Sequence, residues 1–426
     1  MERNYITFDE GMKANCKSAY SVMIKPVGSM CNLNCTYCYY IDKKRLYGNS
    51  QNTMSDDILE AFINDYLYNN SASEIVFMWH GGEPLMAGLD FFEKAIEIQN
   101  RSSKKISNCI QTNGILITDE WCNFFHKNNF LVGISIDGPE DIHNFYRKNN
   151  YGYNSFEKAL RSINLMQKHC VEFNTLSVVN NLSEQRGQEI YQFLKGIGAK
   201  YMQFLPCIDY IYKNSLYKDH CVIASPTKIT NNSISSGEII KAPWSVSSGG
   251  YGNFLNNIFD DWVISDVGNI FVQLFDMTLC SWCNISPPVC AYRESCGDVL
   301  VLEHNGDVYS CDHFVYEDNL LGTINDSKII DILHSPKQIL FGTDKRNTLS
   351  RECIRCKYYF ACKGECPKHR HSATADGELK FSLCDGIKLY YNHTKPYMLY
   401  MRDLLMSKKS PSEVMEFAET MIMNSK

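Results

Sequence analysis

Three cysteines in one short loop have a spacing that suits a metal centre with an open position. Cys31, Cys35 and Cys38 occur in the stretch KPVGSMCNLNCTYCYY with C-x3-C-x2-C spacing, and the next cysteine in the chain is Cys109. A closed tetrahedral metal site needs four protein ligands. Three thiolates can instead hold three irons of a four-iron, four-sulfide cluster and leave the fourth iron for a small bidentate ligand. The alternative is a zinc site that a distant residue completes.

A second group of cysteines lies in the C-terminal third of the chain and is large enough for two more clusters. It has eight members: Cys290, Cys296, Cys311, Cys353, Cys356, Cys362, Cys366 and Cys384. Eight thiolates can ligate two complete four-iron clusters, and a pair of structural zinc sites is the alternative. Cys280 and Cys283 form a further C-x2-C pair that could replace one of these ligands.

The composition favours a reduced, globular, cytoplasmic protein. The chain has 426 residues, of which 44% are hydrophobic and 19 are cysteine, and its net charge is −6. The cytosol keeps thiols reduced. A count of 19 cysteines therefore indicates metal or iron–sulfur ligation rather than disulfides. The acidic balance predicts no nucleic-acid partner. We expect no signal peptide and no membrane span, because charges interrupt every apolar run.

Strand-like and helix-like segments alternate between residues 20 and 209 and must position the first cysteine loop. The expected strands are 20–27, 74–81, 105–114, 130–138, 172–180 and 200–209, and the expected helices are 55–70, 90–101, 118–129, 154–169 and 183–198. This alternation predicts a parallel sheet with right-handed crossovers. Six units are too few for a closed eight-stranded barrel, so we expect a partial (β/α)6 TIM-like barrel. Ligands of such barrels gather at the carboxyl ends of the strands, where the cysteine loop follows the first strand.

The rest of the chain divides by composition. Residues 210–244 are polar and irregular, 251–279 are helical, and 299–311 form a β-hairpin with Asn305–Gly306 at the turn. C-terminal helices follow the cysteine-rich part. We therefore expect four regions: a barrel at 18–240, a helical connector at 250–280, an auxiliary-cluster domain at 281–390 and terminal helices at 391–426.

The cysteine loop and its companions resemble the radical S-adenosylmethionine superfamily. The supporting motifs are GGEP (81–84), QTNG (111–114) and SIDGP (135–139), each at the end of an expected strand. The resemblance implies that S-adenosylmethionine binds the open iron and that its cleavage gives a 5′-deoxyadenosyl radical. It also implies cofactor contacts from five residues: Gly82 by close backbone approach, Ser135 to the ribose, Arg147 to the methionyl carboxylate, and Tyr37 and Ile208 to the adenine. The alternatives are core packing for Tyr37 and Ile208 and a surface salt bridge for Arg147.

The C-terminal cysteines resemble the twin-cluster extension called SPASM. By this resemblance Cys290, Cys296, Cys311 and Cys366 hold auxiliary cluster one. By the same resemblance auxiliary cluster two is held by Cys353, Cys356, Cys362 and Cys384. With the first loop, this makes three four-iron, four-sulfide clusters.

Over nearly its whole length the chain resembles the anaerobic sulfatase-maturating enzymes, through segments such as IKPVGSMCNLNCTYCYY, FLVGISIDGPEDIHNFYRK and NGDVYSCDHFV. These enzymes oxidise a cysteine or serine in a C/S-x-P/A-x-R motif to Cα-formylglycine. The resemblance implies an unfolded or nascent sulfatase polypeptide as substrate and a reducing donor such as flavodoxin or ferredoxin. It makes Asp312 the proton acceptor, with His313 as the rival base and a turn-capping aspartate as the structural alternative. His80 departs from the glutamine that some relatives have before GGEP.

Two other functions also fit these motifs. One is a SPASM enzyme that forms thioether or carbon–carbon crosslinks in peptides. The other is a non-catalytic, zinc-binding interaction protein.

Overall fold

The computed structural model describes residues 7, 19–47, 53–215 and 221–425, which fall into two compact units. The first unit includes residues 1–135, 144–173 and 295–348. The second includes residues 136–143, 174–294 and 349–426. The four expected regions remain a prediction, because the compact units are defined by proximity in space rather than by order along the chain.

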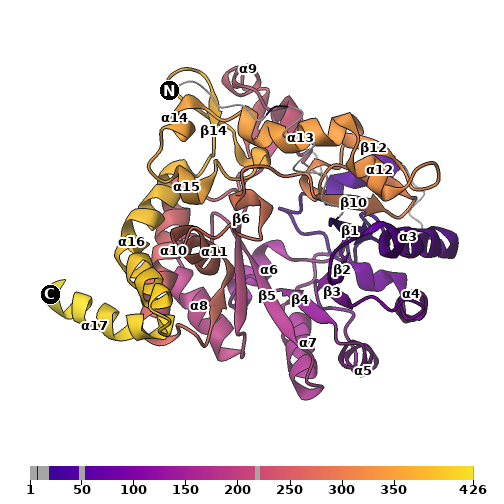
Figure 1. Cartoon of the computed structure of the whole chain (residues 1–426), viewed down its shortest axis with the longest axis horizontal. Helices are drawn as coiled ribbons and strands as arrows, with labels where there is room; N and C mark the ends of the chain where they lie inside the picture. Colours follow the sequence, from indigo (N-terminus) through magenta and orange to yellow (C-terminus); the bar gives the residue numbers. More distant parts are fainter. Residues whose placement is uncertain (1–6, 8–18, 48–52, 216–220, 426) are drawn as a thin grey trace. The chain divides into compact units, whose positions relative to one another are not determined.

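A mostly parallel sheet forms the centre of the first unit, and its strands lie side by side in Figure 1. The strand order is β12–β11–β10–β1–β2–β3–β4. The bounds are β1 Ser21–Lys25, β2 Ile75–Trp79, β3 Ile106–Thr112, β4 Leu131–Ser135, β10 Val299–Glu303, β11 Asp307–Tyr309 and β12 Leu320–Thr323. The apolar, β-branched runs fill these strands because every second side chain packs into the core. The predicted strands of this unit are confirmed.

Amphipathic helices cover this sheet as the sequence predicts. They are α3 Asp56–Asn69, α4 Leu89–Gln99, α5 Asp119–Lys127 and α7 Phe156–Lys168. In α3 the Ser55 hydroxyl caps the helix by accepting from the Ile58 N–H. The same helix buries Phe62 and Tyr66, whose rings contact Phe77 of β2. The helices therefore fix the strands whose ends carry the motifs.

The expected hairpin at 299–311 is confirmed and joins the sheet in a way that the sequence does not show. β10 and β11 pair antiparallel, and Gly306 takes a left-handed conformation at the turn with φ +91°. β10 also pairs parallel with β1, which sets Lys25 opposite Glu303. β11 therefore runs antiparallel to β1, and the Asp312 carboxylate, shortly after β11, accepts from the ammonium of Lys25, the last residue of β1.

The second unit combines a short parallel sheet with long helices. Its strands run in the order β5–β6–β9, with bounds β5 Phe173–Val179, β6 Tyr201–Pro206 and β9 Phe271–Val272. Its principal helices are α8 Gly187–Gly196, α10 Ser248–Ser265, α11 Gln273–Trp282, α16 Cys384–Met406 and α17 Val414–Ser425. The expected helices at 183–198 and the C-terminus are therefore confirmed. The mostly helical 251–279 segment consists of α10 and α11 with the short strand β9 between them.

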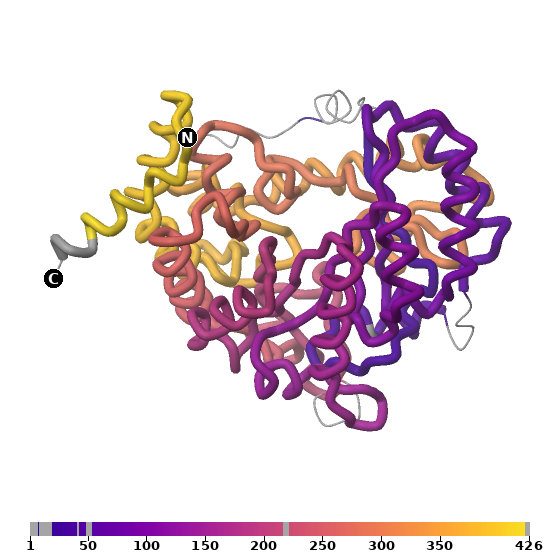
Figure 2. The backbone as a smooth tube through the Cα atoms, turned by 90° about the horizontal axis from the view of Figure 1, so that it is seen from below, coloured from indigo at the N-terminus to yellow at the C-terminus, as the bar shows by residue number. Residues whose placement is uncertain are grey.

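Helices α10 and α16 pack closely because glycines face each other. A Cβ on Gly386 would lie 1.9 Å from the Ser248 carbonyl oxygen, and one on Gly252 would lie 2.5 Å from the Gly386 carbonyl oxygen. Figure 2 shows α16 as part of the yellow C-terminal tube. This contact matters for the site because α16 begins at Cys384.

The 210–244 segment is more ordered than its polar composition indicates. β7 Tyr210–Tyr212 pairs antiparallel with β8 Ile239–Lys241, and α9 Asn231–Ser235 lies between them. Ala224, Ile229 and Ile239 form a small buried cluster of their own. A few apolar residues are thus enough to fold this segment locally. Of the helices that the structure describes, none combines the length and apolarity needed to cross a bilayer.

Candidate active site

The first cysteine loop is anchored to the end of β3 and to the segment after residue 145. The Asn113 amide approaches Cys31 Sγ at 3.7 Å, and the Leu33 N–H does so at 3.4 Å. The backbone N–H groups of Asn34 and Thr36 donate to the carbonyls of Lys148 and Tyr146. Burial, with Glu83 nearby, raises the pKa of the Cys31 thiol well above its usual range. A metal centre offsets this cost, since a coordinated thiol is deprotonated outright, and so the buried donor set fits an iron–sulfur cluster.

The GGEP segment lies beside this loop, and the packing of Gly82 leaves no room for a side chain there. A Cβ on Gly82 would lie 2.1 Å from the Met30 carbonyl oxygen. The missing side chain therefore lets the segment pack on the backbone before Cys31. The Glu83 carboxylate accepts from the Thr112 hydroxyl at 2.7 Å and the Asn113 N–H at 2.8 Å. Burial raises the Glu83 pKa to about 7 even though these donors lower it.

Two of the predicted cofactor-binding residues, Tyr37 and Arg147, contact each other. The Arg147 guanidinium carbon is 5.5 Å from the centre of the Tyr37 ring, and both residues are buried. Burial excludes the surface salt bridge as the role of Arg147. Ser135 ends β4, and its hydroxyl accepts from the Gln111 amide at 3.1 Å. Ile208 is buried in the second unit.

Asp312 is the centre of a buried network in the first unit. Its Oδ1 accepts from the Lys25 ammonium and its Oδ2 accepts from the Tyr39 hydroxyl. Lys25 is fully buried, and 9% of Asp312 is exposed. Burial alone would raise the Asp312 pKa, but Lys25, His80 and His313 together hold it well below its usual range. The carboxylate is therefore charged at neutral pH. This network makes simple turn capping an incomplete description of Asp312.

The Lys25 ammonium has a partner for each of its three hydrogens. Besides Asp312 it contacts His80 Nδ1 at 3.1 Å and lies 4.3 Å from the centre of the Tyr40 ring. His80 Nδ1 also accepts from the Gly81 N–H at 2.8 Å, which leaves the ring proton on Nε2. Burial and Lys25 lower the His80 pKa to about 4. His80 is therefore neutral at pH 7 and orients Lys25 toward Asp312.

A second buried carboxylate lies next to this network. Glu303 is opposite Lys25 in the β1–β10 pair, and its Oε1 accepts from the Tyr40 hydroxyl. Its Oε2 lies 3.5 Å from His304 Nδ1. Lys25 is therefore paired with the Asp312 carboxylate and lies opposite a second acidic residue in the sheet, which explains how a full ammonium charge is tolerated here.

Sequence reasoning found Asp312 and drew attention to His80, but it missed Lys25 and Tyr39. The signal for Lys25 was available, because it is the only charged residue in the run YSVMIKPV at the end where ligands gather. Tyr39 gave no such signal. It reads as one aromatic residue among several in YCYY, and only the fold brings its hydroxyl to Asp312.

Two cysteines of the predicted auxiliary cluster one belong to the first unit, where Gln338 brings their neighbours together. The buried Gln338 amide donates to the Gly297 carbonyl at 2.8 Å and to the Ser310 carbonyl at 3.1 Å. These residues adjoin Cys296 and Cys311. The other two expected ligands, Cys290 and Cys366, belong to the second unit. The grouping of these four cysteines stays a prediction.

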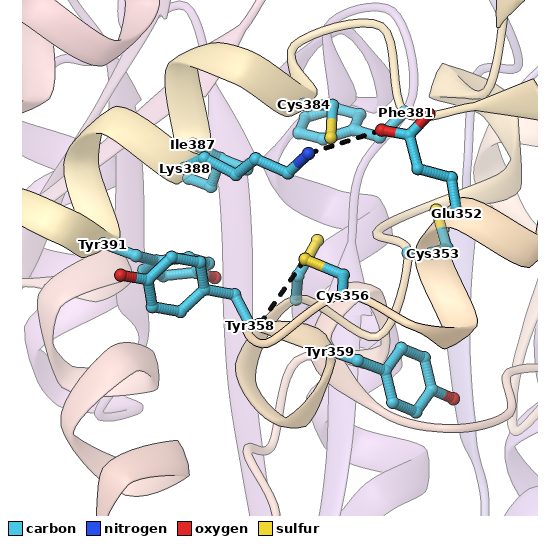
Figure 3. A pocket seen from close by; sticks show the side chains of 12 residues that line it. Glu352, Cys353, Cys356, Tyr358, Tyr359, Phe381, Cys384, Ile387, Lys388 and Tyr391 are labelled. Atoms are coloured by element: carbon cyan, nitrogen blue, oxygen red, sulfur yellow. Dashed lines mark hydrogen bonds and ion pairs between the residues drawn. The ribbon is translucent and has the colours of Figure 1, made fainter. Parts of the chain in front are cut away.

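The four cysteines predicted for auxiliary cluster two line one cavity in the second unit (Figure 3). Cys353, Cys356, Cys362 and Cys384 line a small cavity that is open to solvent in part. Tyr358 and Tyr391 form an aromatic wall of this cavity. Burial raises the Cys362 pKa to about 12, with Glu365 and the other thiols adding to the rise. Four thiols around an apolar space fit a four-iron cluster.

The C-x2-C pair of Cys280 and Cys283 lies elsewhere in this unit. Cys280 belongs to the last turn of α11 and Cys283 caps it. Neither residue lines the cavity of Figure 3. The cavity therefore gives no support for the alternative in which this pair replaces one of the four cysteines there.

Comparisons with known proteins agree with this geometry. The radical SAM superfamily profile matches residues 26–194, and the profile described as an iron–sulfur cluster-binding domain matches residues 290–357. A serine-type anaerobic sulfatase-maturating enzyme of Bacteroides thetaiotaomicron is 45% identical over 93% of this chain and 94% of its own length. The chain belongs to the anaerobic sulfatase-maturating enzymes. A cysteine-type member of this family, from Clostridium perfringens, is 33% identical over 89% of this chain and 97% of its own length.

Solved structures of the family have the same fold. A structure described as native anSMEcpe with bound AdoMet and Cp18Cys peptide has a TM-score of 0.77 and 32% identity, and the match covers 90% of this chain and 99% of that one. Streptococcus suis SuiB bound to S-adenosylmethionine is 12% identical with a TM-score of 0.59, which shows a shared fold alone. The present chain, as a member of the sulfatase-maturating family, is a radical SAM enzyme with a SPASM domain. Its cofactors are S-adenosylmethionine and iron–sulfur clusters, so the zinc-binding alternative is wrong.

Proposed function

We propose that this enzyme oxidises the Cβ of a serine or cysteine in a C/S-x-P/A-x-R motif of a sulfatase polypeptide to Cα-formylglycine. The observation that carries the proposal is the buried Asp312, held as a carboxylate by Lys25 directly after the cluster ligand Cys311. The 45% identity to a serine-type maturase supports the same conclusion.

The cofactors are held by residues that fit them. Cys31, Cys35 and Cys38 hold the radical cluster, and the eight later cysteines hold the auxiliary clusters in the grouping given above. When bound, these groups supply a 5′-deoxyadenosyl radical that removes a Cβ hydrogen atom and a cluster that takes up the second electron. Ser135 binds the ribose, Arg147 pairs with the methionyl carboxylate, and Tyr37 and Ile208 border the adenine. The Gly82 backbone approaches the methionyl group.

Asp312 accepts the proton of the substrate side chain. As the Cβ centre loses its second electron, the Oγ–H or Sγ–H proton passes to the carboxylate and a carbon–oxygen or carbon–sulfur double bond forms. With serine the product is the aldehyde itself. With cysteine, water replaces the sulfur and hydrogen sulfide leaves. Base assistance of this kind contributes about 10²–10⁴-fold.

Lys25, Tyr39 and His80 prepare Asp312 for this step. Lys25 keeps the carboxylate charged in a buried place, and Tyr39 fixes its second oxygen. His80 holds Lys25 in position through its Nδ1. The neutral His80 and the adjacent His313 are the nearest other bases, and His313 is the rival for the proton. His313 packs edge-on against the Tyr39 ring, with centroids 5.7 Å apart, so it belongs to the same cluster.

The partners follow from this chemistry. The substrate motif must reach Asp312 as an extended peptide, which favours an unfolded or nascent sulfatase chain. A reducing protein such as flavodoxin or ferredoxin supplies the first electron. We place the enzyme in the cytoplasm, where its 19 cysteines stay reduced.

The direct test is anaerobic incubation of the reconstituted enzyme with S-x-P-x-R and C-x-P-x-R peptides. Mass spectrometry after reaction with a hydrazine reagent should show an aldehyde at the serine or cysteine position. An intramolecular crosslink without an aldehyde would replace this proposal by the peptide-crosslinking alternative.

A further inference from the structure

One lysine of α16 faces the cysteine cavity of the second unit. Lys388 lies one helical turn after Cys384, so both side chains are on the same face of α16. Both residues line the cavity. Figure 3 shows the Lys388 ammonium directed toward the space between Cys384 and Glu352. Lys388 has no role in the proposed reaction, so the position of its positive charge beside the four cysteines needs an explanation.

Glu352 holds Lys388 in this position together with a second lysine. The Glu352 carboxylate accepts from Lys380 Nζ at 2.7 and 2.9 Å through its two oxygens, and from Lys388 Nζ at 3.4 Å. The exposed fraction is 15% for the Lys380 side chain and 31% for that of Lys388. The group of Glu352, Lys380 and Lys388 therefore carries two positive charges against one negative charge, and Lys388 lines the same cavity as Cys384.

We propose that Lys388, held by Glu352, raises the reduction potential of the cluster bound by Cys353, Cys356, Cys362 and Cys384 and so makes that cluster the better electron acceptor. This inference rests on the proposed assignment of those four cysteines to one cluster. Reduction adds a negative charge to the cluster, and a fixed cation beside a ligand sulfur stabilises that charge. Lys388 thus acts on the reaction only through the reduction potential of the cluster, and it contacts no substrate.

Another donor to the same site comes from the backbone and is left unchanged by side-chain substitution. The Tyr358 N–H approaches Cys356 Sγ at 3.4 Å. This contact sets a base level of the potential that is common to all Lys388 variants. A change in potential between variants therefore reports the lysine charge alone.

The test is an anaerobic redox titration of the full chain with all clusters loaded, monitored by electron paramagnetic resonance. In Lys388→Met the equilibrium constant for reduction of this cluster should fall about tenfold, which is about 59 mV for a one-electron couple. Lys388→Arg keeps the charge and should stay close to wild type. The matched control is Lys395→Met, which removes the same charge from an exposed position about two turns further along α16.

The signal of this cluster is identified with Cys384→Ser, which keeps a ligand oxygen and should change that signal only. If Lys388→Met leaves the potential of the identified cluster unchanged, or if Lys395→Met shifts it equally, the inference is wrong while the assignment of the cysteines stands. If Cys384→Ser changes no cluster signal and no iron content, the assignment itself is wrong and the inference loses its basis.

Discussion

Asp312 carries the proton step, and the residues around it decide whether it is available as a base. Its partners come from distant parts of the chain, since Lys25 and Asp312 are separated by 287 positions. A buried carboxylate without such a cation would take up a proton at neutral pH. The pairing with Lys25 is therefore what makes a dry site compatible with base catalysis.

Replacing Asp312 by asparagine keeps the size of the side chain and removes the base. The variant should still cleave S-adenosylmethionine and still take a hydrogen from the peptide. Formylglycine should fall by about 10²–10⁴-fold. Quantifying 5′-deoxyadenosine and formylglycine in the same reaction checks both parts. Loss of cleavage together with product would indicate a structural role beside Cys311, and full activity would transfer the base role to His313 or water.

Lys25→Met should destabilise the protein strongly as well as slow product formation. The change leaves Asp312 buried without its cation, and breaking a buried pair in this way costs about 3–5 kcal/mol. Thermal unfolding of the anaerobic protein measures the effect. The matched control is Lys105→Met, because Lys105 forms an exposed pair with Glu74 at 2.7 Å, and such pairs contribute about 0–1 kcal/mol. Equal stability losses in the two variants would contradict the proposed network.

His80 should make stability depend on pH in the acid range. Burial and Lys25 lower its pKa to about 4, whereas an unfolded histidine titrates near 6.5. The unfolded chain therefore binds the proton first, and stability is lost as pH falls from about 6.5 toward 4. His80→Gln removes this contribution. The difference in melting temperature between pH 7 and pH 5 should be smaller in this variant than in wild type, and an equal or larger difference would show that His80 is not buried neutral.

Among single residues, the sequence predicted those whose spacing along the chain indicates a metal ligand or its neighbour. The C-x3-C-x2-C loop and the cysteine before Asp312 could be recognised from residue types alone. Lys25 could have been noticed as the lone charge of its strand, but its pairing with Asp312 and the role of Tyr39 could not be assigned, because both depend on contacts between β1, the loop after it and the segment after β11. Spacing along the chain contains no information about such contacts.

At the scale of helices and strands, the periodicity of apolar residues predicted where each element lies in the sequence. It predicted less well which strands pair with each other. The alternating pattern identified β1 and the β10–β11 hairpin. It did not indicate that β10 pairs parallel with β1, since these strands are about 280 residues apart in sequence and either could have been an edge. That pairing is nonetheless what places the hairpin that precedes Asp312 beside the strand of Lys25.

The close contact between α10 and α16 should be sensitive to a single methyl group. Gly386→Ala places a Cβ against the Ser248 carbonyl, so the helices must separate and Cys384 at the start of α16 must shift. We expect a lower melting temperature, by an amount typical of overpacking at about 1–3 kcal/mol, and weaker iron binding. Gly249→Ala in α10 is the control, because a Cβ there meets nothing within 4 Å. Unchanged melting and iron content in Gly386→Ala would contradict the role of this contact.

For the whole molecule the assignment of eleven cysteines predicts about twelve irons per chain. Replacing Cys31, Cys35 and Cys38 by alanine should leave about eight irons and abolish S-adenosylmethionine cleavage. Iron analysis after anaerobic reconstitution measures the first, and chromatography of 5′-deoxyadenosine measures the second. Cleavage that survives the triple change would contradict the radical site. A loss of four irons in Cys280→Ala, with none in Cys290→Ala, would contradict the grouping of the auxiliary ligands.

The central claim is that the enzyme takes a hydrogen from Cβ and leaves an aldehyde there. The most direct measurement uses an S-x-P-x-R or C-x-P-x-R peptide with deuterium at Cβ of the target residue. We predict that deuterium appears in 5′-deoxyadenosine, and that formylglycine forms in an amount equal to the labelled 5′-deoxyadenosine. Unlabelled 5′-deoxyadenosine, or a labelled one accompanied by a crosslinked peptide that carries no aldehyde, would contradict the account.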